Sequence, residues 1–112
     1  MNKPIQVVFF RLGSGREPVR EWLKSLDRES RKAIGEDIKT VQFRWPIGMP
    51  LVRKLEDDLW ELRSQIASGI ARTFFTVYDR KVVLLHGFVK KSDRTPAKEL
   101  ATAKRRLKTL RS

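Results

Sequence analysis

Apolar positions in the first third of the chain predict one strand followed by two helical segments. Residues 5–10, "IQVVFF", form a β-branched and aromatic run that ends at a glycine-containing loop, which is typical of a buried strand. Pro18 suits the first position of a helix, and Asp27 suits the cap of a second. Their helically spaced apolar stripes are Val19, Trp22, Leu23 and Leu26, then Ile34, Ile38 and Val41. We expect either an antiparallel helical hairpin or one bent helix.

Three strands are predicted after the helix-breaking stretch "RWPIGMP", at about residues 59–66, 70–78 and 82–89. Two-residue turns at Ser68-Gly69 and Asp79-Arg80 favour antiparallel hairpins over crossover connections. Residues 51–55 can add an edge strand or a preceding strand. The third strand is apolar on both faces, which indicates a central place in the sheet.

The chain ends in a predicted basic helix. Thr95 is a plausible cap, Pro96 suits the first position, and the apolar line is Leu100, Ala103, Leu107 and Leu110. The 112 residues suffice for one modest core. We therefore predict a single α+β domain over residues 1–112, with a small antiparallel or mixed sheet, an N-terminal helical hairpin and a basic C-terminal helix.

The net positive charge of the chain indicates a negatively charged partner. The net charge is +12, and residues 86–112 alone contain nine basic and two acidic residues. Such a local positive field attracts polyanions, which include nucleic acids, acidic proteins and anionic membrane surfaces. The absence of cysteine excludes disulfides and thiolate zinc sites, and no apolar run is long enough to span a bilayer. With no signal-peptide pattern at the N-terminus, a soluble cytoplasmic protein without membrane partners is the simplest interpretation.

The predicted hairpins bring basic residues together. If Ser68-Gly69 is a two-residue turn, Arg63 faces Phe74 and Gln65 faces Arg72 across the first hairpin. Strand alternation then places Glu61, Arg63, Arg72 and Phe74 on one face. The second hairpin brings Gly87 or Phe88 opposite Arg72.

The second hairpin also carries Lys90 and Lys91 to the end of the sheet at which Arg72 lies. Arginine forks and ammonium groups in one place suit a phosphodiester. Taken singly, each cation is more often a solvated surface charge, and Arg63 can simply pair with Glu61. The hypothesis of a phosphodiester site therefore depends on the four cations lying close together.

The remaining candidate residues have structural alternatives. His86 lies mid-strand, where a packed and hydrogen-bonded histidine is more common than a general base. Phe74 can stack on a nucleic-acid base or be covered by a helix. Trp60 is assigned to the core. The acidic run at residues 56–58 is interpreted as a solvated turn, so we expect no metal site.

The motifs "LWELR", "AR", "LLHGFVKK", "TP" and "AKRRL" follow one another from residue 59 to residue 107. The sequences and spacing of these motifs, and the order of the predicted strands and helices, resemble the RelE/ParE superfamily of toxin–antitoxin toxins. The resemblance is closest to its HigB-like, phage-derived branch. The resemblance covers about residues 4–110. It implies a RelE-like fold and a ribosome-dependent endoribonuclease that cuts mRNA and is silenced by an antitoxin.

The resemblance also implies residue roles. Cleavage in such enzymes needs no metal or other cofactor and proceeds by attack of the ribose 2′-hydroxyl on the adjacent phosphorus. Carried over by position, Arg72 and Arg63 stabilise charge in the transition state, and Lys90 and Lys91 hold phosphate or donate a proton. Glu61 is the nearest candidate for the base. In the basic helix, Lys98, Lys104 and Arg105 are expected to bind RNA, together with Phe74.

The chain departs from the well-studied branch in ways that keep other functions open. That branch has lysines where this chain has Leu59 and Glu61, and a tyrosine near the last helix where this chain has neither tyrosine nor histidine. The general acid and base are therefore unassigned. A ParE-like inhibitor of DNA gyrase and a non-toxic nucleic-acid-binding module remain alternatives. The expected partners are the ribosome, mRNA and an antitoxin with a helix-turn-helix fold.

Overall fold

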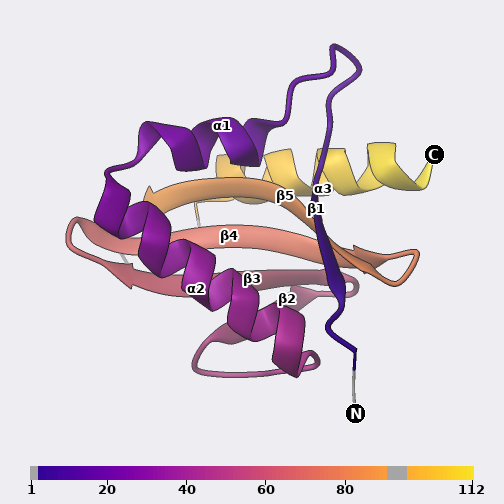
Figure 1. Ribbon diagram of the computed structural model, residues 1–112. Helices are drawn as coiled ribbons and strands as arrows, with labels where there is room; N and C mark the ends of the chain where they lie inside the picture. The colour runs from indigo at the N-terminus through magenta and orange to yellow at the C-terminus, as the bar shows by residue number, and fades with distance from the viewer. Residues whose placement is uncertain (1–2, 91–95) are drawn as a thin grey trace.

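The computed structural model describes residues 3–90 and 96–112. In these ranges a five-stranded sheet of order β1-β5-β4-β3-β2 is packed between helices (Figure 1). In chain order the elements are β1 (Gln6–Phe9), α1 (Pro18–Ser25), α2 (Arg28–Arg44), β2 (Val52–Glu56), β3 (Leu59–Ile66), β4 (Gly69–Tyr78), β5 (Lys81–Lys90) and α3 (Ala97–Arg111). The predicted small α+β class is confirmed. None of the helices within the described ranges is both long and apolar enough to cross a membrane.

The N-terminal helical region forms two separate helices rather than one bent helix, with α1 packed on β5 and β1 and α2 on β3. Leu26 ends α1 in an extended conformation, and Asp27 begins α2 as its cap by accepting a hydrogen bond from the Ser30 amide at 3.1 Å. The cap satisfies an amide that has no partner inside the helix. The change of chain direction therefore lies in Leu26 and Asp27.

The sheet is mixed because β1 runs parallel to β5, while the other neighbouring strands are antiparallel. Strand β2 forms one edge, and β5 lies between β1 and β4 as its apolar faces predicted. The Asp79-Arg80 turn is confirmed, with φ values of 51° and 61° that suit a tight hairpin.

The other predicted turn is wrong by one position. The β3–β4 loop is Ala67-Ser68, since Ile66 pairs with Gly69. Gly69 has a φ of 141° and its position leaves only 3.0 Å from a built Cβ to the Lys90 carbonyl oxygen, so the glycine is needed in the strand beside β5. The register therefore moves by two residues, and Arg63 faces Arg72 while Gln65 faces Ile70. A shift of two leaves every side chain on its predicted face.

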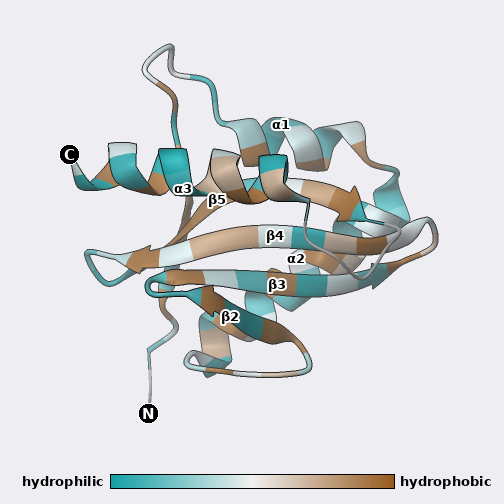
Figure 2. Ribbon diagram, turned by 180° about the vertical axis from the view of Figure 1, so that it is seen from behind, coloured by the Kyte–Doolittle hydropathy of each residue, from teal (hydrophilic) through white to brown (hydrophobic). Residues whose placement is uncertain are grey.

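Apolar side chains fill both sides of the sheet. On one side α1 and α2 cover a core that includes Val19, Val41, Leu62 and Phe75. On the other side α3 covers a second core of Phe10, Leu59, Phe74, Val83, Leu85, Phe88, Ala103 and Leu107. Figure 2 shows α3 from this second side, lying along β5 and β4. Each core needs apolar residues on one face of the strands, and the chain supplies both.

Gly87 of β5 lies against the indole of Trp22 in α1 and leaves no room for a methyl group. A Cβ there would overlap two ring atoms and lie 2.8 Å from Cδ2. Gly87→Ala is expected to lower the free energy of unfolding by about 2–3 kcal/mol, the usual cost of overpacking. Urea unfolding measures the change.

The matched control is Gly35→Ala in α2, where a built Cβ has nothing within 4 Å. It is expected to stabilise the protein by about 0.5–1 kcal/mol, because alanine is the better helix former. Equal stability of the Gly87→Ala variant and the parent protein would contradict the packing of Trp22 on β5.

Candidate functional site

Three neighbouring strands place their basic residues on the face of the sheet that α3 covers. Arg63 of β3 lies directly opposite Arg72 of β4, Arg72 lies opposite Phe88 of β5, and Lys90 of β5 lies opposite Ile70. Paired residues and residues two apart in a strand share a face. The predicted convergence of Arg63, Arg72 and Lys90 is therefore present. Lys91 lies outside the described residues.

The centre of this group is a buried ion pair. Arg72 Nη1 donates a hydrogen bond of 2.6 Å to Glu61 Oε1, and the two side chains are 1% and 0% exposed. Arg63 Nε lies 3.9 Å from the same oxygen, and the Arg63 side chain is 28% exposed. Unlike Arg63, Arg72 does not present its guanidinium to solvent. Its guanidinium lies inside the protein, where a charge is tolerated only with a partner such as Glu61.

Two donors in this group have no acceptor among the residues that the structure describes. They are the Nε atoms of Arg63 and Arg72, both shielded from solvent. Nearly all buried polar groups in proteins are hydrogen-bonded, so exceptions point to a function, a water or an ion. The two arginines lie opposite each other in the strand register. The arrangement can therefore accept an anionic oxygen at or beside Arg63, the more exposed of the two.

Phe74 is not available to a nucleic-acid base, which corrects the prediction that it belongs to an RNA-binding surface. The ring is fully buried and belongs to the core beneath Ala103 and Leu107 of α3. It also makes an edge-to-face contact with Phe88 at 5.3 Å between ring centroids. The helix covering that the sequence left as an alternative is the one observed. Trp60 packs in the opposite core, as predicted.

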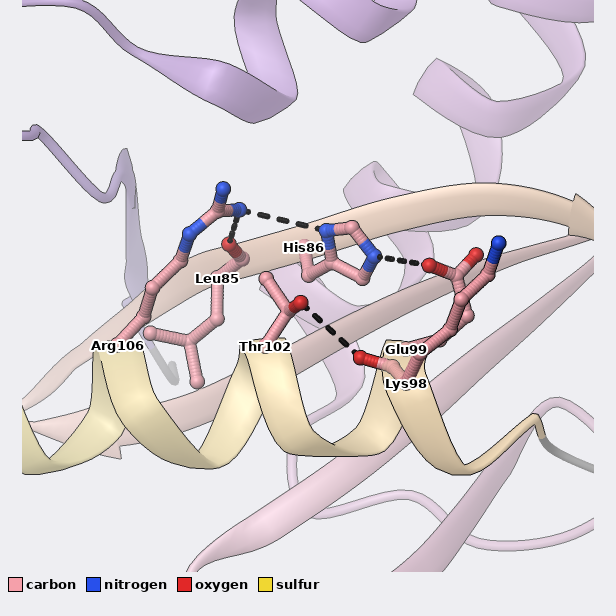
Figure 3. A network of polar contacts seen from close by, with 6 residues as sticks. All are labelled: Leu85, His86, Lys98, Glu99, Thr102 and Arg106. Carbon is pink, nitrogen blue, oxygen red and sulfur yellow. Dashed lines mark hydrogen bonds and ion pairs between the residues drawn. The ribbon is translucent and has the colours of Figure 1, made fainter.

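His86 joins β5 to α3 through both ring nitrogens (Figure 3). Arg106 Nη1 lies 3.3 Å from Nδ1 and also donates to the Leu85 carbonyl oxygen at 2.8 Å. Because a guanidinium only donates, Nδ1 must accept, and in the neutral ring Nε2–H then donates to Glu99 Oε1 at 3.1 Å. The preferred interpretation of His86 as a packed, hydrogen-bonded residue agrees with this geometry. Sequence reasoning missed Glu99 and Arg106, although their i, i+7 spacing places them on one helix face.

Burial lowers the pKa of His86, and the positive charges of Arg106 and Arg105 act in the same direction, although Glu99 opposes them. A histidine whose folded-state pKa is depressed contributes fully to stability above its unfolded value near 6.5. The contribution falls as the pH drops from there through the folded-state pKa, because the unfolded chain then binds the extra proton.

We therefore expect the free energy of unfolding of the parent protein to fall more steeply between pH 7 and pH 5 than that of His86→Gln. Urea unfolding across this range measures both slopes. Glutamine keeps polar contacts but does not titrate, so carboxylates that titrate lower in the range affect both proteins alike. Parallel slopes would contradict the neutral, buried histidine.

The basic residues of α3 lie apart from the buried pair, on the exposed side of the helix. Lys98, Lys104 and Arg105 are all exposed, and Lys104 Nζ lies 3.5 Å from Glu56 Oε1. Their charge is accessible to a polyanion, and their RNA-binding role stays a prediction. The described residues contain no cluster of three or more histidine and carboxylate side chains that could hold a metal ion.

Arg63 also lines an open pocket of about 410 Å³ that sequence reasoning missed. Gln65 and Ile70 contribute to it from the sheet, and Glu36 and Asp37 contribute from α2. No local pattern pointed to it, because its walls come from separate segments of the sequence, namely α2, Pro50 and Leu51, β3 and β4. The pocket gives the Arg63 side of the site an accessible space that Arg72 does not line.

Sequence similarity to known proteins identifies the family of this chain. No curated protein matches the chain significantly. The sequence model of one family, described as Phage derived protein Gp49-like (DUF891), matches residues 21–108. This family is associated with RelE/HigB-like toxins, and the observed fold is compatible with a RelE-like fold. The matched region runs from α1 through α3 and includes the arginine pair, so the chain belongs to the Gp49-like family of phage-derived proteins.

Proposed function

We propose that this protein is the toxin of a type II toxin–antitoxin system and acts as a ribosome-dependent mRNA endoribonuclease. The observation that carries the proposal is the convergence of Arg63, Arg72 and Lys90 from three adjacent strands beside the carboxylate of Glu61. Membership in a family associated with RelE/HigB-like toxins supports it. An antitoxin with a helix-turn-helix fold is the proposed protein partner.

The proposed reaction is an internal transesterification of RNA. The 2′-oxygen forms a bond to the adjacent phosphorus, the bond from phosphorus to the 5′-oxygen breaks, and a 2′,3′-cyclic phosphate and a free 5′-hydroxyl result. One proton leaves the 2′-hydroxyl and one reaches the departing 5′-oxygen. Guanidinium and ammonium groups stabilise the negative charge that grows on the phosphate, and such electrostatic stabilisation is often the largest contribution to catalysis. Lys91 is proposed to assist Lys90 in this role.

The test is to map mRNA ends in frame with ribosomes after brief expression of the toxin. We expect new ends within translated codons and arrest of growth for the parent protein, and a strong loss of both for Arg63→Gln. Lys108→Gln is the matched control, because Lys108 is an exposed cation of α3 outside the proposed site. Arrest of growth with intact mRNA and inhibited DNA supercoiling would instead identify a gyrase inhibitor. Normal growth would leave only a nucleic-acid-binding module and would refute the proposal.

A further inference from the structure

We infer that Arg63 is the arginine that contacts the substrate phosphate, and that Glu61 and Arg72 form a positioning pair that acts through it. The inference rests on the proposed function. It gives Arg63 the role of binding phosphate and Arg72 the role of positioning Arg63. It also assigns to Glu61 a role other than that of general base.

Exposure separates the two arginines. The Arg63 side chain is 28% exposed and lines the open pocket beside β3, whereas Arg72 is 1% exposed. A phosphodiester of a polymer must stay attached to its neighbours on both sides, so it meets surface groups first. In this arrangement Arg63 is the guanidinium that such a ligand reaches.

The contacts of Glu61 explain why Arg72 is needed without touching substrate. Glu61 Oε1 lies 2.6 Å from Arg72 Nη1 and 3.9 Å from Arg63 Nε. The same carboxylate oxygen therefore accepts a hydrogen bond from Arg72 and makes a longer ionic contact with Arg63. The short contact with Arg72 satisfies this carboxylate oxygen, whereas its contact with Arg63 is long. Without Arg72, this oxygen would lose its short hydrogen bond, and its attraction for Arg63 would compete with that of a phosphate.

Glu61 is needed in turn because Arg63 and Arg72 are directly opposite in the strand register. Like charges at opposite positions repel each other, and the carboxylate between them offsets this repulsion. A carboxylate with no exposed surface and a short bond to a guanidinium is also poorly placed to take a proton from a 2′-hydroxyl. The geometry therefore favours a counter-ion over a base.

The experiment replaces the pair as a unit. Glu61→Leu combined with Arg72→Met removes both buried charges together, a change that buried ion pairs in proteins often tolerate. Cleavage of ribosome-bound mRNA is measured under multiple-turnover conditions for this double variant, for Arg63→Gln and for the parent protein, so that kcat and KM are obtained separately. Circular dichroism confirms that each variant is folded.

We expect Arg63→Gln to lower kcat by about 100-fold to 1,000-fold, the range for loss of one group that stabilises transition-state charge. The double variant should lower kcat less than Arg63→Gln does, by about 10-fold to 100-fold, because Arg63 remains but has lost the pair that positions it. The rate of the double variant should fall toward low pH as the rate of the parent does, because the group that must lose its proton for catalysis is not Glu61. A folded double variant as slow as Arg63→Gln, or one whose rate no longer falls toward low pH, would overturn the inference.

A second measurement uses the parent protein and needs no variant to fold. The Nε–H groups of arginines are followed by nuclear magnetic resonance during titration with inorganic phosphate and with a short RNA carrying 2′-O-methyl groups. The Arg63 signal should shift and the Arg72 signal should not. A shift at Arg72 of equal size would show that its Nε, which has no acceptor among the described residues, binds the anion directly. If the parent protein fails to cleave mRNA, the proposed nuclease fails, whereas the titration still decides between the two arginines.

Discussion

Arg72→Met is expected to lower the free energy of unfolding by about 3–5 kcal/mol, because it removes the short hydrogen bond and the positive charge that Arg72 gives the buried Glu61 carboxylate. Glu61 is 0% exposed and its Oε1 accepts the Arg72 hydrogen bond at 2.6 Å. Arg63 is too distant, at 3.9 Å, to replace that bond without moving. Urea unfolding monitored by circular dichroism measures the loss.

The double variant with Glu61→Leu supplies the internal control. When both charges are absent, neither member of the pair remains as a buried ion without its partner, and the stability should return to within about 1–2 kcal/mol of the parent, as for other buried pairs replaced by apolar residues. The two single variants and the double variant then form a thermodynamic cycle, whose interaction energy should be large for residues in direct contact. If Arg72→Met costs less than about 1 kcal/mol, the value typical of a surface pair, the pair is not buried in solution.

The faces of the strands were predictable from the sequence because side chains alternate with a period of two. Glu61, Arg63, Arg72 and Phe74 were assigned to one face, and the structure keeps them there although the β3–β4 turn begins one residue earlier than expected. An odd shift of register would have moved them all. The position of the turn was missed because Gly69 suits a turn by its conformation, while here its small size is needed next to the Lys90 carbonyl.

Exposure could not be predicted in the same way. Whether Arg72 and Phe74 face water depends on what packs over them, and α3 comes from a segment more than 20 residues further along the chain. The amphipathic pattern of α3 predicted that one side would be buried, yet nothing in it specified which part of the sheet that side would cover. Local periodicity therefore identified the members of the site but not the depth of each.

Phe74→Ala is expected to lower the free energy of unfolding by about 3–5 kcal/mol, the usual cost of removing a buried aromatic ring. The ring is fully buried and packs with Phe88 and with the α3 residues Ala103 and Leu107. Its loss leaves a cavity where the sheet meets α3, so both the sheet and the helix lose contacts. Thermal and urea unfolding should agree on the size of the effect.

Phe43→Ala is the matched control, because Phe43 is 57% exposed on α2 and its removal should change stability by no more than about 0.5 kcal/mol. A gentler substitution separates packing from RNA stacking at position 74. Phe74→Leu keeps an apolar side chain in the core and should cost less than about 1.5 kcal/mol, with RNA affinity unchanged. A base stacked on Phe74 would instead require an exposed ring, and loss of RNA affinity in a stable Phe74→Leu protein would show that α3 moves away from β4 when RNA binds.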